Sequence, residues 1–176
     1  MMPDDFKALV RTVPDFPRAG IQFRDITTLL ADAEGFAGAI DWMAGEAASA
    51  QLIAGIEARG FIFGAALARE LGLGFVPIRK AGKLPVAAIR QSYALEYGED
   101  SLELDPTLIE KNARVVLVDD LIATGGTARA AASLLRQAGA IVEQALFVID
   151  LPDLGGANLL EIEGIATSAL MQFEGD

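Results

Sequence analysis

The spacing of hydrophobic positions changes between the first third of the chain and the rest. Apolar residues at helical spacing predict helices over 4–13 and 35–50, separated by a stretch rich in proline and glycine. From residue 52 onward, short runs that are apolar at every position alternate with helical segments. Such runs are typical of parallel strands that helices bury on both faces. The pattern therefore predicts an α/β fold with a mostly parallel central sheet flanked by helices.

The predicted elements follow one another in a regular strand–helix order. We expect helices over 61–71 and 127–138, because a glycine follows each of them, as it commonly follows the last turn of a helix. The 176 residues contain no repeat or linker, so we expect a single domain spanning 1–176. The expected strands are 52–56, 75–78, 115–118, 145–149 and 166–170.

One long segment, 79–100, is polar and does not fit this order. We expect a loop there, with a possible hairpin around 93–97 and 102–104. Its first half carries four cations before its first acid: Arg79, Lys80, Lys83 and Arg90. A cationic cluster in so acidic a chain suggests an anionic ligand, and a solvated surface loop is the alternative.

Composition narrows the chemistry that the chain can perform. The formal net charge of -11 disfavours binding to nucleic acid or to an anionic membrane. The chain has no Cys and no His, which excludes disulfides, thiolate-bound metals and histidine-dependent catalysis. Residues 1–5 lack the features of a secretory signal, and no apolar run reaches the length of a membrane span, so we expect a cytoplasmic protein.

The most informative stretch, VVLVDDLIATGGT from Val115 to Thr127, runs from a buried strand into a turn. Ligands of parallel sheets bind beyond the carboxyl ends of the strands, where this turn is expected to lie. Gly125 and Gly126 let backbone amides approach an anion. Thr124 and Thr127 add hydroxyl donors at the start of the next helix, where negative charge is favoured. We expect the turn to bind a phosphate, with an ordinary capped strand–helix turn as the alternative.

Two acids, Asp119 and Asp120, stand just before this turn and would repel a phosphate unless something lay between them. A ribose diol suits that place, because it donates two hydroxyl hydrogens to carboxylates. A magnesium ion near the diol would offset the remaining charge. The turn is not a Walker loop, because no Lys follows the glycines. The pattern therefore predicts a site for ribose 5-phosphate.

The stretch from Val115 to Thr127 resembles the phosphoribosyl pyrophosphate signature of the type I phosphoribosyltransferases. Four further segments resemble the adenine phosphoribosyltransferase family in order and spacing: 16–27, 55–61, 79–85 and 92–98. The resemblance covers nearly the whole chain. It implies the type I phosphoribosyltransferase fold, with an N-terminal helix and base-binding hood over 1–34 and a flexible catalytic loop over 79–100.

The resemblance implies an enzyme of purine salvage, a pentosyltransferase that joins adenine to phosphoribosyl pyrophosphate and releases AMP and pyrophosphate. It also implies a homodimer, and Mg²⁺ that is bound mainly through phosphoribosyl pyrophosphate rather than by a protein motif. Asp119 and Asp120 would hold the ribose hydroxyls. The 5′-phosphate would be held by the turn of Ala123, Thr124, Gly125, Gly126 and Thr127.

Pyrophosphate, by the same resemblance, would bind a loop that contains Ala58, Arg59 and a cis peptide bond. Arg59 as a plain surface residue is disfavoured, because a cation at a helix start opposes the helix dipole.

The implied catalytic residues are Glu96, Arg59 and Lys83, and Arg79 and Lys80 are implied as further cations. Glu96 would accept the proton that adenine loses, since no His is present, although an exposed loop acid is the alternative. Tyr97 would shape the loop over the ribose.

Adenine would lie against an apolar wall that the hood and the end of the fourth strand form. Phe23 would stack on the purine, backbone groups near Gln22 would read its amino edge, and Arg24 follows in the same segment. Leu151 matches a position that lines the base pocket. Phe23 as plain core packing is an alternative. Gln22 stands where the family often has an apolar residue, which leaves the base preference more open than the reaction.

Two other functions are compatible with the sequence. A phosphoribosyltransferase for hypoxanthine or guanine, xanthine or orotate would share the phosphate turn and differ in the hood. A nonenzymatic ligand sensor on the same fold would keep the turn and lack catalysis. The presence of Glu96, Lys83 and Arg59, without a basic stripe for DNA, favours the enzyme.

Overall fold

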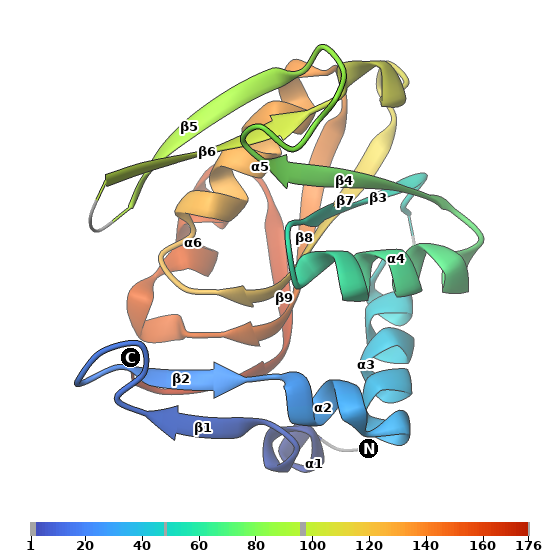
Figure 1. The fold of residues 1–176 in the computed structure, drawn as a ribbon. Helices are drawn as coiled ribbons and strands as arrows, with labels where there is room; N and C mark the ends of the chain where they lie inside the picture. Colours follow the sequence, from blue (N-terminus) through green and yellow to red (C-terminus); the bar gives the residue numbers. More distant parts are fainter. Residues whose placement is uncertain (1–2, 48, 96–97, 176) are drawn as a thin grey trace.

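The computed structural model describes residues 3–47, 49–95 and 98–175, and its centre is a twisted sheet with helices on both faces (Figure 1). Within these residues seven strands form the sheet in the order β5-β6-β4-β3-β7-β8-β9. Pairing is parallel from β4 through β3, β7 and β8 to β9, and antiparallel between β4, β6 and β5. This confirms the expected α/β fold. The strands are β3 (Leu52–Ile56), β4 (Gly74–Lys80), β5 (Ile89–Leu95), β6 (Gly98–Leu104), β7 (Arg114–Ile122), β8 (Ile141–Asp150) and β9 (Ala166–Gln172).

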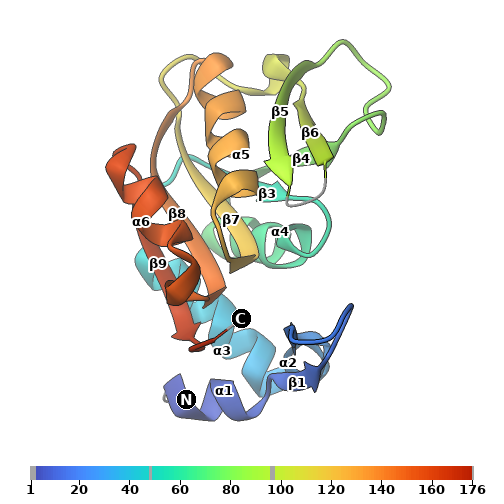
Figure 2. The same cartoon turned by 90° about the vertical axis from the view of Figure 1, so that its left-hand side faces the viewer.

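The helices divide between the two faces of the sheet, as the two views show (Figures 1 and 2). Buried side chains of α5 and α6 pack with one face, and those of α1 to α4 pack with the other. The central strands are buried on both sides, which explains their continuous apolar runs. The helices are α1 (Pro3–Ala8), α2 (Thr27–Ala31), α3 (Ala33–Glu46), α4 (Gly60–Leu71), α5 (Gly126–Gln137) and α6 (Gly156–Ile162). None of the helices in the described ranges has the length and apolar character needed to cross a bilayer.

Two helix predictions need correction at their ends. The first helix ends at Ala8 rather than at residue 13, because the chain turns into β1 (Arg11–Pro14) and pairs antiparallel with β2 (Gln22–Asp25). The second helix covers Ala33–Glu46 rather than 35–50. It starts earlier because the side chain of Asp32 accepts a hydrogen bond from the Gly35 amide at 2.7 Å and caps the helix.

The segment 79–100 is not the continuous loop that its polarity predicted. Arg79 and Lys80 complete β4, and β5 and β6 form a hairpin longer than the one expected. The strands were predicted only in part, because this edge of the sheet exposes one face and pairs charges across it, as Arg90 does with Glu103. Continuous apolar runs, which mark the buried central strands, are absent here.

The β1–β2 hairpin lies beyond the carboxyl ends of β7 and β8, apart from the main sheet (Figure 2). Asp25 anchors it, because its carboxylate accepts hydrogen bonds from the Thr27 hydroxyl at 2.6 Å and from the Arg11 guanidinium. These bonds, those from Thr27 first, lower the pKa of Asp25 to about 2. A lowered pKa means that folding favours the ionised carboxylate. The carboxylate of Asp25 therefore stabilises the fold above pH 3.8, which is the ordinary value of its pKa.

Replacing Asp25 should therefore remove stability only where the carboxylate is ionised. Asp25→Asn is expected to lower the free energy of unfolding by about 1–2 kcal/mol at neutral pH. The difference from the parent should shrink as the pH falls from about 4 towards 2. Urea titrations over this range measure it, with exposed Asp41→Asn as the control. A deficit that does not change with pH would show that the charge of Asp25 is not the cause.

Candidate active site

The turn after β7 is fixed in place by its neighbours. Gly125 has a φ of +85°, and a Cβ at this position would lie 2.9 Å from the carbonyl oxygen of Gly156. Only glycine meets both conditions without strain. The Gly156 amide donates to the carbonyl of Ala123 at 2.9 Å, which ties the turn to the start of α6. The turn therefore presents the N-terminus of α5 in a fixed direction.

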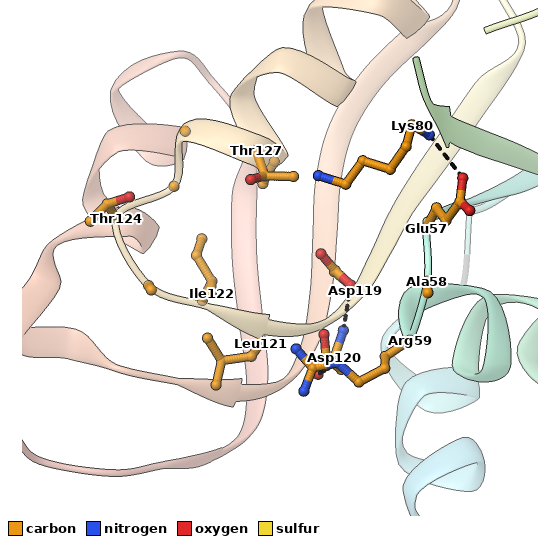
Figure 3. A pocket seen from close by; sticks show the side chains of 14 residues that line it. Glu57, Ala58, Arg59, Lys80, Asp119, Asp120, Leu121, Ile122, Thr124 and Thr127 are labelled. Atoms are coloured by element: carbon orange, nitrogen blue, oxygen red, sulfur yellow. Dashed lines mark hydrogen bonds and ion pairs between the residues drawn. The ribbon is translucent and has the colours of Figure 1, made fainter. Parts of the chain in front are cut away.

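A second loop, between β3 and α4, faces this turn across a cavity of about 350 Å³ (Figure 3). The peptide bond between Glu57 and Ala58 is cis, as the resemblance implied for this loop. A Cβ on Gly60 would lie 2.7 Å from Oδ1 of Asp119, so glycine allows the start of α4 to approach that acid. The N-termini of α4 and α5 both open on the cavity, and the first amides of a helix have no intrahelical acceptor. The cavity is therefore suited to anions.

Two carboxylates lie on the floor of this cavity. Burial, and then the neighbouring charge of Asp120, raise the pKa of Asp119 well above its ordinary value. Asp120 is 4% exposed, and its Oδ2 lies 3.1 Å from Nε of Arg59 without the geometry of a hydrogen bond. The two carboxylates are hydrogen-bond acceptors that are partly shielded from water, and hydroxyl groups of a ligand could donate hydrogen bonds to them.

Glu57, which lines the cavity, binds the side chain of Arg79 and the backbone of Lys80. Its Oε2 accepts from Nε of Arg79 at 3.0 Å and from the backbone amide of Lys80 at 2.8 Å. Although burial opposes ionisation, these bonds hold the pKa of Glu57 below its ordinary value. The ammonium of Lys80 reaches over the cavity towards Thr127 and donates to the Tyr93 hydroxyl at 2.8 Å (Figure 3).

A second, largely apolar cavity of about 500 Å³ continues from the first. One side is the β1–β2 region with Gln22, Phe23 and Arg24, and the other is Leu151 with Leu154. The two cavities share four lining residues: Arg59, Leu121, Ala123 and Thr124. Together they form one elongated site, with an end for anions, two carboxylates near the middle and an apolar end for a flat ring.

Most of the residues predicted from the sequence meet in this site. The lining of the two cavities includes Ala58, Arg59, Lys80, Asp119, Asp120, Ala123, Thr124, Gly125, Gly126, Thr127, Gln22, Phe23, Arg24 and Leu151. Arg79 and Lys83 belong to the described residues but do not line either cavity. Glu96 and Tyr97 lie outside the described residues.

Sequence reasoning placed Glu57 in the pyrophosphate loop but missed its hydrogen bonds to the guanidinium of Arg79 and the backbone amide of Lys80. It stood inside a quoted motif, and the signal was its place at the end of a buried strand, across from Arg79 and Lys80. Leu121, Leu154, Arg18 and Ile21 also line the site and had no assigned role. No short-range pattern identifies these four, because the fold brings them together from distant segments.

The acidic side chains of the site decide whether it could hold a metal ion. Within the part of the chain that the structure describes, no cluster of three or more acidic side chains could enclose a cation. Asp120 does have a buried oxygen without a hydrogen-bond partner. These residues fit a Mg²⁺ ion that takes most of its oxygen ligands from a bound phosphate compound.

Comparison with known proteins agrees with this geometry. Residues 25–157 match the phosphoribosyl transferase domain family. The chain is 64% identical to an adenine phosphoribosyltransferase of Novosphingobium aromaticivorans over 99% of both chains. The chain belongs to the adenine phosphoribosyltransferase family. This confirms the resemblance on which the predicted fold and function depend.

Solved adenine phosphoribosyltransferases share the whole fold. The enzyme from Thermoanaerobacter pseudethanolicus superposes with a TM-score of 0.92 at 44% identity, covering 98% of this chain and 100% of that one. The enzyme from Saccharomyces cerevisiae gives a TM-score of 0.90 at 36% identity, covering 96% and 97%. The latter was crystallised with adenine and an imino-altritol bisphosphate.

Proposed function

We propose that this chain transfers the 5-phosphoribosyl group from phosphoribosyl pyrophosphate to adenine, giving AMP and pyrophosphate in purine salvage. The observation that carries the proposal is the continuity of the two cavities. An anion-binding end, a pair of acids and an apolar end follow one another in the order of phosphate, ribose and base in a nucleotide. Family membership independently supports the same reaction.

The ribose 5-phosphate part would occupy the turn and the acid pair. The amides and hydroxyls of Ala123 to Thr127 would hold the phosphate by charge-assisted hydrogen bonds, which are the strong kind. Asp119 and Asp120 would accept from the ribose hydroxyls. Fixing the sugar in this way orients the anomeric carbon between the base and the leaving group.

The leaving pyrophosphate would lie near Ala58, Arg59 and the ammonium of Lys80. The guanidinium of Arg59 is paired with Asp120, and its central carbon lies 5.7 Å from the centroid of the Phe23 ring. The side chain must therefore turn towards pyrophosphate when substrate binds. Arg79 and Lys83 would act as further cations, with Lys83 brought in by movement of the loop between β4 and β5. Positive charge there would stabilise the charge that develops on the leaving group.

The base would lie between the hood and the wall at Leu151, with Phe23 against the ring and backbone groups near Gln22 and Arg24 at its edge. Glu96 would accept the proton that the imidazole ring of adenine loses on attack, and Tyr97 would cover the ribose. The edge-to-face contact of Phe23 with Phe16, at 5.2 Å between centroids, supports the orientation of the Phe23 ring.

Three accompanying properties belong to the same proposal. Mg²⁺ would be bound mainly through phosphoribosyl pyrophosphate, where it neutralises phosphate charge, with Asp119 and Asp120 nearby. The protein would form a homodimer, which sedimentation velocity tests. It would act in the cytoplasm as one phosphoribosyltransferase domain over 1–176, with the hood over 1–34.

Turnover with a panel of bases tests the proposed reaction. AMP formation is measured in a coupled assay with adenine, phosphoribosyl pyrophosphate and Mg²⁺. The same assay is repeated with hypoxanthine, guanine, xanthine and orotate. Adenine is expected to support the fastest turnover. Equal rates with hypoxanthine or guanine would contradict the assignment of the base, and no turnover with any base would favour the ligand sensor.

A further inference from the structure

The two walls of the base pocket come from separate parts of the fold, so something must set their separation. The hood wall belongs to the β1–β2 hairpin, which forms a sheet of its own, whereas Leu151 follows β8 in the main sheet. Residues 173–175 lie beside β2, whose Arg24 contacts Phe173 and Glu174 (Figure 1). We name residues 173–175 the C-terminal strap.

The strap is fastened to the main sheet on one side. The Phe173 amide donates to the carbonyl of Asp150 at 3.0 Å. The Gly175 amide donates to Oδ2 of Asp153 at 2.8 Å. Asp150 and Asp153 flank the segment that carries Leu151, so the strap is attached at the wall of the base pocket.

The strap holds the hood on its other side through Arg24. The guanidinium carbon of Arg24 lies 4.6 Å from the ring centroid of Phe173, within the range of a cation–π contact. Nη2 of Arg24 donates to the carbonyl of Glu174 at 3.3 Å, and Nη1 donates to the Thr12 hydroxyl of β1 at 2.7 Å. One side chain therefore joins both strands of the hairpin to the strap.

We propose that Phe173 is a positioning residue of the base pocket, which acts through Arg24 to hold the hood at a fixed separation from the wall at Leu151. This inference rests on the proposed function, because it takes the pocket to be the adenine site. Phe173 is not among the residues that line the pocket in the described chain, so its effect on the base is indirect. Its loss should widen the pocket for the base and leave the phosphate turn unchanged.

Phe173→Leu tests this inference, because leucine keeps apolar volume and removes the ring face under Arg24. The KM for adenine should rise about five- to tenfold, whereas the KM for phosphoribosyl pyrophosphate and kcat at saturating adenine should stay near the parent values. Calorimetry should show AMP binding weakened and pyrophosphate binding unchanged. Phe173→Tyr keeps the ring and should restore the parent behaviour.

A second variant decides the matter if Phe173→Leu fails to fold. Asp153→Ala removes the acceptor of the Gly175 amide and should raise the adenine KM in the same selective way, by a smaller factor. An unchanged adenine KM, or an equal rise in both KM values, would overturn the inference. Failure of the proposed function is a separate result, because the parent protein itself would then form no AMP.

Discussion

Asp119→Asn is expected to give a protein that is more stable at neutral pH and captures phosphoribosyl pyrophosphate more weakly. Burial and the charge of Asp120 raise the pKa of Asp119, so the folded state disfavours its ionised form. Asparagine removes the charge and so relieves this penalty. A gain of about 1 kcal/mol would raise the midpoint of thermal unfolding by about 2–4 °C in a chain of this size.

The pH dependence identifies the cause of this gain. Below the ordinary pKa of 3.8, both folded and unfolded chains carry a protonated Asp119, and the part of the stability difference that comes from its charge should vanish. Above it, the advantage of the variant should grow with pH until Asp119 is ionised in the folded parent. The exposed Asp41→Asn is the control and should show no such trend.

The same substitution should slow the reaction, because the amide replaces an acceptor with a group that also donates. We expect kcat/KM for phosphoribosyl pyrophosphate to fall about 5- to 150-fold, which corresponds to about 1–3 kcal/mol. Steady-state kinetics at saturating adenine measure the loss. Kinetic constants equal to those of the parent would contradict the proposed contact with the ribose.

Gly125→Ala is expected to lose kcat/KM for phosphoribosyl pyrophosphate by about a hundredfold or more. The position has a φ of +85°, which costs about 1–2 kcal/mol for a residue with a side chain. Its Cβ would also lie 2.9 Å from the carbonyl oxygen of Gly156, and backbone on both sides must move. A displacement of about 1 Å in a site that orients substrate is enough for such a loss.

Gly164→Ala separates backbone strain from displacement of the turn. Gly164 has a nearly equal φ of +78°, and a Cβ there would meet no atom within 4 Å. Gly164→Ala should lose about as much stability as the positive φ alone costs in Gly125→Ala, and it should keep its activity. Thermal unfolding and steady-state kinetics of both variants make the comparison. Equal activity in the two variants would show that the phosphate does not depend on the position of the turn.

The elements that the sequence predicts well are those whose environment is simple. β3, β7 and β8 are buried on both faces, so they appear as uninterrupted apolar runs. The hairpin of β5 and β6 lies at the sheet edge, where one face is polar and Arg90 pairs with Glu103 across the strands. The sequence therefore predicted only a shorter hairpin within a longer loop. The first helix was predicted too long, because Arg11–Pro14 pairs with β2, which overrides the helical spacing of Val13.

The residues of the site also divide into those that a local sequence pattern predicts and those that it does not. The phosphate turn is local in sequence, so a strand, two acids and a glycine-rich turn identified it. The wall of the base pocket and the bonds of Glu57 to Arg79 and Lys80 depend on chain segments far apart. Those residues were found through resemblance to a family, and the hydrogen bonds of Glu57 were not predicted. The contacts of Arg24 with the C-terminal strap likewise join residues about 150 positions apart, which no local pattern indicates.

A crystal structure with bound AMP tests the central claim most directly. The phosphate is expected on the turn from Ala123 to Thr127, the ribose hydroxyls at Asp119 and Asp120, and the adenine ring between Phe23 and Leu151. Electron density for the phosphate elsewhere, or a ribose turned away from both aspartates, would contradict the account.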